Sequence, residues 1–208
     1  MANRKKIVKL LPIFEQKFGQ PEEIYLLFAD LCGSTEFKKN CLDTEQPELV
    51  WIGRQLIFLE RAAEIINKYE GDVVKTIGDE VFAYFDKSKE PGRILKCAIE
   101  VIQSFDNLKF YVGKSKINAK ISIDFGPTYN GSISESIPFD PIGLPVDRCA
   151  RLNSSADSNE IIFSQSFCDR LTSTDPANVS HEKLYGYKKH DIDAKGLGRI
   201  NGYKITIN

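Results

Sequence analysis

The chain has 208 residues, 42% of them hydrophobic, which is enough for one domain with a substantial core. Its 28 basic residues nearly balance 29 acidic ones, so the net charge of −1 provides no basic surplus for a nucleic-acid partner. No apolar run reaches the ~18 residues that a membrane-spanning helix needs. The five cysteines are odd in number and widely spaced, which predicts reduced thiols and a cytoplasmic protein.

The first 20 residues are predicted to form a separate helical segment. Apolar residues recur at helical spacing over residues 7–18, and Gly19-Gln20-Pro21 ends the pattern. The stretch lacks the uninterrupted apolar core and the small-residue cleavage site of a secretory signal. We expect this segment, residues 1–20, to cap the domain or stabilise a dimer, and residues 21–208 to form a single domain.

Residues 24–29 begin the main domain with a continuous apolar run, which predicts a central strand buried on both faces. Helical periodicity then extends over residues 48–69. Short apolar segments at residues 73–77 and 81–85 flank Gly78-Asp79-Glu80, which indicates a β-hairpin.

The remaining patterns complete an α+β arrangement. They predict helices over residues 91–105, 145–152 and 165–171, and strands over residues 117–125, 161–163 and 203–207. The order is β-α-ββ-α-β, followed by further short elements. It predicts a ferredoxin-like, palm-type βαββαβ domain whose helices cover one face of a largely antiparallel sheet.

Two acidic residues stand at turns that this arrangement brings together. Asp30 ends the first strand, and Asp79 lies at the tip of the hairpin. The small residues Gly33, Ser34 and Thr35 follow Asp30 and can open a helix, whose first N–H groups would face an anion. Two carboxylates beside a phosphate cradle suit Mg²⁺, which prefers hard oxygen ligands and retains phosphates in its shell. Each motif alone is common in ordinary turns, and the combination is more specific.

These motifs resemble those of the class III adenylyl and guanylyl cyclases over most of the chain, from about residue 24 to residue 207. The similar segments are Phe28-Ala29-Asp30-Leu31-Cys32-Gly33-Ser34-Thr35, Lys75-Thr76-Ile77-Gly78-Asp79-Glu80-Val81, Ile123-Asp124-Phe125-Gly126-Pro127, Phe139-Asp140-Pro141-Ile142-Gly143, Val146-Asp147-Arg148-Cys149-Ala150-Arg151-Leu152, and Lys195-Gly196 followed by Tyr203. In this family the first two segments bind metal, the fifth contacts the reacting phosphate, and the last contacts the terminal phosphates.

The resemblance implies a two-metal site. Asp30 and Asp79 would hold two divalent ions, Mg²⁺ or Mn²⁺, and the carbonyl of Leu31 would assist. The reaction it implies joins the ribose 3′-oxygen of a nucleoside triphosphate to the α-phosphorus and releases pyrophosphate. In such a site two ions stabilise both the attacking and the leaving oxygens.

The resemblance also implies roles for the other side chains. Lys75 and Asp140 match the pair that reads the base edge, Arg151 the arginine that stabilises the reacting phosphate, and Lys195 the lysine on the terminal phosphates. Asp147 departs from the pattern, because the family usually has asparagine there to orient the ribose. Asp147 either pairs with Arg151, four residues further along the predicted helix, or weakens ribose positioning.

Every role is present in this one chain, which predicts a homodimer with two equal, shared sites. Each subunit would give metal ligands to one site and base contacts to the other. A lysine only donates hydrogen bonds and an ionised aspartate only accepts them, so Lys75 and Asp140 fit adenine and favour ATP. Cytosine presents the same acceptor and donor groups as adenine, and uracil could fit with its donor and acceptor exchanged in position. Guanine is disfavoured because it would need an acidic group in place of Lys75.

Other functions remain open on the sequence. Lone cyclase domains resemble both small bacterial adenylyl cyclases and the pyrimidine cyclases of phage-defence signalling, so CTP or UTP is an alternative substrate. A non-catalytic cyclase-fold module that binds nucleotide is a second alternative, supported by Asp147. Another palm-like enzyme, such as a polymerase or dinucleotide cyclase, is a third, and the segments around Asp140 and Arg151 argue against it.

Overall fold

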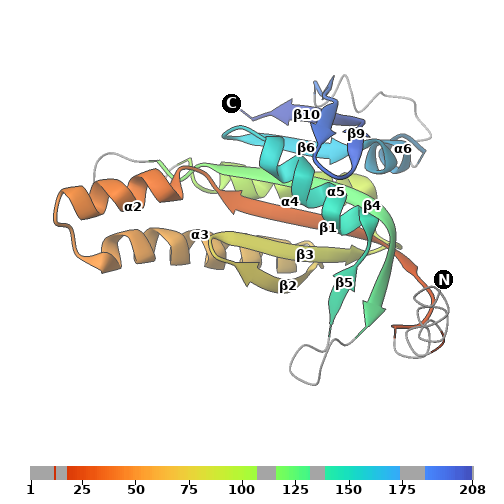
Figure 1. The fold of residues 1–208 in the computed structure, drawn as a ribbon, viewed down its shortest axis with the longest axis horizontal. Coiled ribbons are helices and arrows are strands. Elements are labelled where there is room, and N and C mark those ends of the chain that lie inside the picture. The colour runs from red at the N-terminus through yellow and green to blue at the C-terminus, as the bar shows by residue number, and fades with distance from the viewer. Residues whose placement is uncertain (1–11, 13–17, 107–115, 132–138, 174–185, 208) are drawn as a thin grey trace, which may run out of the picture.

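A computed structural model of the chain describes residues 12, 18–106, 116–131, 139–173 and 186–207 (Figure 1). The helix predicted over residues 7–18 lies almost entirely outside these described residues. The helices are α2 (Ser34–Asp43), α3 (Glu48–Lys68), α4 (Pro91–Gln103), α5 (Leu144–Ser155) and α6 (Gln165–Ser173). The strands are β1 (Glu22–Leu31), β2 (Asp72–Ile77), β3 (Glu80–Asp86), β4 (Ala119–Gly131), β5 (Asp140–Ile142), β6 (Glu160–Ser164), β7 (Lys188–Lys189), β8 (Ile192–Ala194), β9 (Gly198–Ile200) and β10 (Gly202–Thr206).

The strands form one large mixed sheet and one small hairpin. The order in the eight-stranded sheet is β2-β3-β1-β4-β6-β10-β7, with β5 paired to β4 outside this path. Only the β4–β6 pairing in the described sheet is parallel, and β8 pairs with β9 in a separate two-stranded sheet. The predicted α+β class and largely antiparallel sheet are therefore confirmed.

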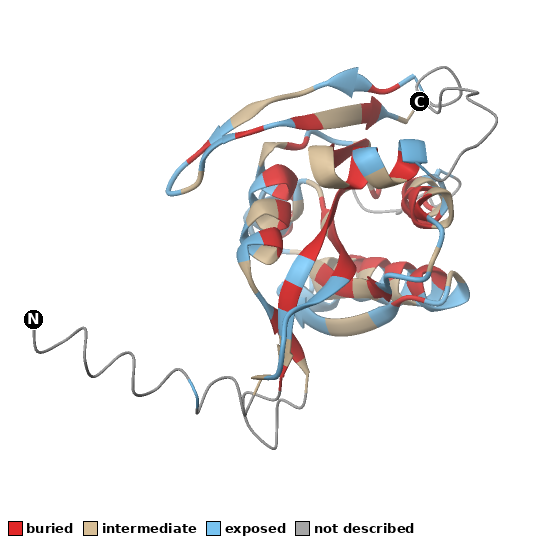
Figure 2. Ribbon diagram, turned by 90° about the vertical axis from the view of Figure 1, so that its right-hand side faces the viewer, coloured by how far each residue is buried: buried red, intermediate tan, exposed pale blue. Residues whose placement is uncertain are grey.

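Strand β1 divides the domain into two layers. Its side chains alternate between faces, so Tyr25 and Leu27 join the core cluster that includes α3, α4 and α6. Leu26 and Phe28 point the other way and pack with Cys149 of α5. The buried residues accordingly gather on the sheet and on the helix surfaces that face it (Figure 2). Helices α3, α4 and α6 cover one face of the sheet, as predicted, and α5 packs on the opposite face.

Helix α3 follows the predicted pattern closely. Phe58, Ala62, Ile65 and Ile66 recur at helical spacing and are almost fully buried; each large side chain of this kind stabilises the fold by roughly 1.5–3 kcal/mol. The chain then turns sharply at Gly71, where a Cβ atom would lie 2.5 Å from the ring of Phe85. Glycine is required there because the ring leaves no room for a side chain.

The sequence predicted a possible helix opening at Gly33–Thr35, but not the length of helix α2 or four of the short strands. Helix α2 packs on α3 beyond the end of the sheet (Figure 1). Few of its residues are apolar and only Phe37 and Cys41 are buried, so helical periodicity is weak. Strands β5, β7, β8 and β9 have two or three residues each, too few to show an alternating pattern.

Four of the five cysteines are buried, and Cys32 is partly exposed. Within the described part of the chain, no helix combines the length and the apolar character needed to cross a membrane.

A buried ion pair fastens α5 to the sheet. Asp124 on β4 is completely buried, and Arg148 of α5 donates to its two oxygens at 2.6 and 2.8 Å. Ser164 and the backbone N–H of Phe125 donate to the same carboxylate. Burial raises the pKa of Asp124, and the guanidinium opposes that rise. The charge is therefore tolerated in the core because all sides of the carboxylate have donors.

We expect Arg148→Met to lower the free energy of unfolding by about 3–5 kcal/mol, because it leaves a buried carboxylate without its cation. Denaturant unfolding followed by circular dichroism measures this loss. Arg61→Met is the control, since Arg61 pairs with Glu64 on the surface of α3 with both side chains about half exposed. Such a pair contributes only ~0–1 kcal/mol. Equal stability of the two variants would show that the pair does not hold α5.

Candidate active site

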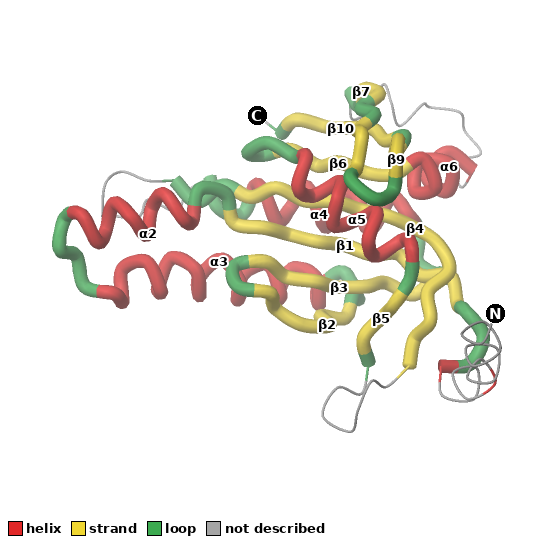
Figure 3. The backbone as a smooth tube through the Cα atoms, in the orientation of Figure 1, coloured by secondary structure: helices red, strands yellow, loops and turns green. Residues whose placement is uncertain are grey.

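The two acidic turns meet at one end of the sheet. Asp30 is the penultimate residue of β1, and Asp79 lies in the turn between β2 and β3. The N–H of Leu31 donates to the carbonyl of Asp79 at 3.3 Å. Figure 3 shows the loop after β1 and the β2–β3 turn at the same end of the sheet. The juxtaposition expected from the sequence is thus present.

Charges are concentrated around Asp30. The register places Glu80 of β3 on one side of it and Lys120 of β4 on the other. Lys120 Nζ lies 3.2 Å from Asp30 Oδ2, and both side chains are about one-fifth exposed. Burial raises the pKa of Asp30; Lys120 opposes this rise and Asp79 adds to it. Burial, reinforced by the Asp30 charge, raises the pKa of Glu80 to about 7.

This group of acids has the chemistry of a divalent-cation site. Asp30, Asp79 and Glu80 repel one another; Lys120 offsets the charges of Asp30 and Glu80, and Arg54 interacts with Asp79. Across the described ranges no cluster of three His, Cys, Asp or Glu side chains is placed to bind a metal. A cation at Asp30 and Asp79 would therefore take further oxygens from backbone, water or a phosphate, which is the usual shell of Mg²⁺.

The predicted phosphate turn opens helix α2. Gly33 is the N-cap residue and adopts φ 68°, a left-handed conformation that glycine tolerates well. Its carbonyl accepts the N–H of Phe37 at 3.0 Å. No side chain caps this helix, so the N–H groups of the first turn, at Ser34 and Thr35, stand at a helix start that favours anions.

The base-reading residues form a pair of their own. Lys75 of β2 makes an ion pair with Asp140 of β5, whose side chain is 13% exposed. A bulge between Val73 and Lys75 sets Lys75 opposite Phe82. Phe82 stacks on Phe28 with ring centroids 4.4 Å apart, so Lys75 lies on the same face of the sheet as α5.

An aromatic wall adjoins this pair. Phe139, which precedes Asp140, lies against Tyr84 of β3 with ring centroids 4.6 Å apart. Burial raises the pKa of Tyr84, and Asp72 adds to the rise. A flat ring beside a donor–acceptor pair is a suitable surface for a nucleobase.

Helix α5 carries Asp147 and Arg151, both exposed and one turn apart. No ion pair joins them in the part of the chain that the structure describes, so the pairing considered from the sequence is not present. The helix is positioned by Asn153, whose Nδ2 donates to the carbonyl of Phe28 at 3.2 Å, and by Arg148. Phe28 is two residues from Asp30, so α5 extends toward the acidic end of β1.

Lys195 lies on the small β8–β9 hairpin, outside the main sheet. It is exposed in the turn between β8 and β9. Ala194 and Ile200 of this hairpin pack with Leu152 of α5, so the hairpin sits on the α5 side of the sheet. Sequence reasoning missed Lys120 and the Asp124–Arg148 pair, because only strand register shows what Lys120 and Asp124 face.

The fold and these clusters define a palm-type α+β domain in which an acidic turn, a phosphate turn and a base-reading pair accompany one sheet. The family described as "Adenylate and Guanylate cyclase catalytic domain" matches residues 17–206. The chain belongs to this family, which confirms the class III nucleotidyl cyclase resemblance of its motifs.

Curated relatives include the protein named guanylate cyclase beta from two Plasmodium species. The Plasmodium berghei protein is 26% identical over 196 residues, which cover 85% of this chain and 6% of the relative. The Plasmodium falciparum protein is 29% identical over 164 residues, covering 70% of this chain and 5% of the relative. The chain thus spans only about one-twentieth of the length of these proteins.

Solved structures share the fold at low sequence identity. The guanylate cyclase domain of RhGC from Catenaria anguillulae, in complex with GTP, aligns with a TM-score of 0.73 at 17% identity, covering 91% of this chain and 98% of that domain. The adenylyl cyclase CyaB from P. aeruginosa aligns with a TM-score of 0.72 at 19% identity, covering 91% and 96%. These likenesses establish the palm-type architecture.

We expect Mg²⁺ or Mn²⁺ to raise the melting temperature, because a bound cation relieves repulsion among the acids at Asp30. At an ion concentration of about 100 times Kd the stabilisation is about 2.7 kcal/mol, or roughly 5–10 °C for a domain of this size. Asp30→Ala and Asp79→Ala should each abolish the shift in differential scanning calorimetry. Glu64→Gln, an exposed change on α3, should retain it. A full shift in both Asp variants would place the cation elsewhere.

Proposed function

We propose that the chain is a nucleotidyl cyclase that converts a nucleoside triphosphate, with ATP as the leading substrate, to a 3′,5′-cyclic nucleotide and pyrophosphate. The observation that carries this proposal is the meeting of Asp30 and Asp79 beside the phosphate turn, in a chain of this family. The Lys75–Asp140 pair adds a base-recognition element on the α5 face of the same sheet. A non-catalytic module would have no need for all of these groups together.

The residues divide the work of the reaction. Asp30, Asp79 and the carbonyl of Leu31 would bind two divalent ions. Such ions lower the pKa of the attacking hydroxyl and neutralise phosphate charge when bound. Arg151 presents a planar fork of donors to the charge that develops on the phosphate. Lys195 supplies a flexible ammonium to the terminal phosphates.

Asp147 has a limited role at the ribose. Ionised, it accepts a hydrogen bond from a ribose hydroxyl but donates none. It is exposed and has no ion pair to Arg151 among the described residues. The Arg151 guanidinium therefore stays available for phosphate. Asparagine could both donate a hydrogen bond to the ribose and accept one from it, whereas Asp147 can only accept.

A homodimer with shared sites completes the arrangement. Apolar side chains are exposed near the proposed site: Ile77 at 49%, Ile142 at 47% and Leu144 at 58%. They lie at the β2–β3 turn, on β5 and at the start of α5, and apolar groups so placed favour contact with another protein. A second copy would cover them and bring its acidic turn to the Lys75–Asp140 pair of the first.

The Lys75–Asp140 pair bears on which base is accepted. Lys75 donates and Asp140 accepts, which matches the ring nitrogen and amino group of adenine. Cytosine has the same edge, so CTP is the pyrimidine alternative. The curated relatives are named guanylate cyclases, which makes GTP a further candidate that the lysine disfavours.

Incubation with each of the four nucleoside triphosphates and Mn²⁺, with products identified by mass, tests the reaction and the base. We expect cyclic AMP as the main product. Lys75→Glu places an acceptor where the donor stood, and should lower ATP turnover by about tenfold while raising the relative use of GTP. Lys189→Glu, an exposed change on β7, is the control.

Three outcomes contradict parts of this proposal. No cyclic product from any nucleotide, by a folded dimer, would favour a binding module. Linear or dinucleotide products alone would indicate another palm-type enzyme. An unchanged ranking of nucleotides in Lys75→Glu would remove this lysine from base recognition.

Mixed dimers test whether the sites are shared. Asp79→Ala removes a metal ligand and Arg151→Ala removes a phosphate donor, so each homodimer should be nearly inactive. A mixed dimer retains one site with all its groups, and we expect up to half the wild-type activity per mixed dimer. A coupled pyrophosphate assay on the mixture measures the rescue. Activity no greater than the sum of the separate variants would show that each subunit works alone.

A further inference from the structure

Helix α3 carries an apolar stripe, formed by Leu49, Gly53 and Leu56, on the side that faces away from the sheet. These three residues recur at helical spacing, so they lie on one side of the helix. The buried residues of the same helix, such as Phe58 and Ile65, point toward the sheet. Leu49 is 78% exposed and Leu56 is 58% exposed. Exposed leucines grouped in this way indicate a surface that another protein segment covers.

Gly53, at the centre of the stripe, is not required by the packing of its own chain. A Cβ atom at this position would meet no other atom within 4 Å, so no neighbour excludes a side chain. Glycine in the middle of a helix is less favourable than alanine. The distance between two packed helices depends on the size of the side chains at their contact, and a glycine there permits a close approach. Gly53 therefore suits a second helix that crosses the stripe.

Acidic residues continue the stripe toward the C-terminal end of α3. Glu60 lies one turn after Leu56 on the same side of the helix and is exposed. Glu64 follows one turn later and pairs with Arg61 at 3.3 Å, whereas Glu60 makes no ion pair within the described ranges. A helix that complements this surface would be apolar along one side and basic at one end.

The helix predicted at the start of the chain has this composition. Its apolar residues recur at helical spacing, and the basic run Arg4-Lys5-Lys6 precedes them. Pro12 and Phe18, the two described positions in this stretch, are both helical, and Pro12 is exposed.

The two patterns complement each other when the helices run antiparallel. The facing pairs are then Phe14 with Leu49, Leu11 with Gly53, Ile7 with Leu56, and Arg4 with Glu60. Apolar residues thus meet apolar residues along the stripe, and the basic end of the segment meets the acidic end of α3.

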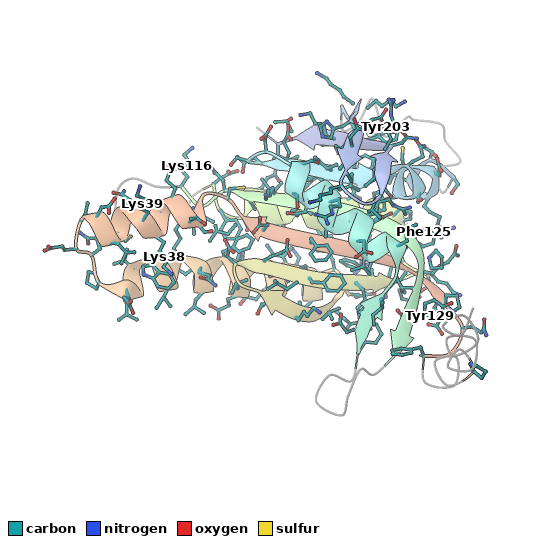
Figure 4. All side chains as sticks on the ribbon, viewed as in Figure 1. Lys38, Lys39, Lys116, Phe125, Tyr129 and Tyr203 are labelled. Atoms are coloured by element: carbon teal, nitrogen blue, oxygen red, sulfur yellow. The ribbon has the colours of Figure 1, made fainter. Side chains whose placement is uncertain are left out.

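The segment is too short to reach the stripe of its own chain. Phe18 lies at the end of β4, where a Cβ atom on Gly131 would be 2.2 Å from its ring. Figure 4 shows Tyr129, near the same end of β4, at the other end of the molecule from Lys38 of α2. Strand β4 has 13 residues and is roughly 40 Å long, whereas the predicted helix spans roughly 17 Å. Only the stripe of a second copy is therefore within reach.

The shared-site dimer brings these two elements together, and this step rests on the proposed function. Gly131 pairs with Asp140 in the register of β4 and β5, so the segment leaves the domain beside the base-reading pair. The second copy would bring its acidic turn to that pair. In each copy the stripe adjoins the acidic turn, because Gln55 of α3 donates to the carbonyl of Gly78 at 2.8 Å. We propose that the N-terminal segment of each subunit docks antiparallel on the apolar stripe of the other.

Charge reversal tests which segment occupies the stripe. Glu60→Lys and Arg4→Glu each place like charges opposite one another. Each should raise the Kd of the dimer about fivefold per contact, and a symmetric dimer has two such contacts. The double variant restores opposite charges and should return Kd to within about threefold of the wild type. Analytical ultracentrifugation of the full chain over a dilution series measures Kd. Glu90→Lys, exposed before α4, is the control and should leave Kd unchanged.

Gly53→Ala separates docking from folding, because its two effects have opposite signs. Alanine favours the helix, so the melting temperature of the monomer, recorded well below Kd, should rise by about 2–4 °C. The added methyl group would hold the docked helix away from α3 and should raise Kd by about tenfold. Asn67→Ala, exposed near the end of the same helix, is the control and should keep the Kd of the wild type.

Two results would overturn the docking. A double variant that stays weak while Gly53→Ala also weakens the dimer would show that two α3 stripes pack on each other instead. A Kd that no variant changes, or a wild-type chain that is monomeric at every concentration, would show that the stripe is not an interface.

Activity measurements separate this inference from the proposed function. A Kd restored in the double variant, with no cyclic product from any nucleotide, would contradict only the proposed function. Rescue of activity in mixed dimers of Asp79→Ala and Arg151→Ala, with no restoration of Kd in the double variant, would contradict only the docking of the segment.

Discussion

The antiparallel register of β1 with its two neighbours is the constraint on which the site depends. It sets Asp30 between Glu80 and Lys120, and the bond from the Leu31 N–H to the Asp79 carbonyl draws the second acidic turn alongside. A shift of β1 by one residue would turn Asp30 to the face covered by α3, α4 and α6, because strand side chains alternate between faces. The fully buried β1 residues make such a shift costly, so the core itself specifies the position of the acids.

The two faces of the sheet have separate tasks. The side covered by α3, α4 and α6 supplies most of the apolar burial. The other side carries α5 and the groups proposed to meet the nucleotide. Arg54 links the two layers, because it lies in the helix layer and donates to a carbonyl of the turn after β1.

The position of α5 depends on polar contacts as much as on packing. Arg148 reaches the buried Asp124, and Asn153 reaches the carbonyl of Phe28. Both contacts tie the helix to adjacent central strands, so Asp147 and Arg151 stay exposed at a defined place above the sheet. Directional bonds of this kind restrict sliding more than apolar contact does, because donors left unmatched in the core are costly.

Local patterns in the sequence determined the order of the main elements and the two acidic turns. The apolar run of residues 24–29, the long periodic stretch that became α3 and the Gly-Asp turn at Asp79 all depend on neighbours in the chain, so they are readable without a structure. The short strands and the polar helix α2 carry too few apolar residues to be seen in this way.

Contacts between distant segments were decided only by the tertiary structure. The pairing of Asp30 with Lys120 and that of Asp124 with Arg148 join residues 24 or more positions apart. Arg54 of α3 likewise meets the carbonyl of Cys32, in the turn after β1. Side-chain types predict what such residues can bind, but strand register and helix placement decide which of them meet.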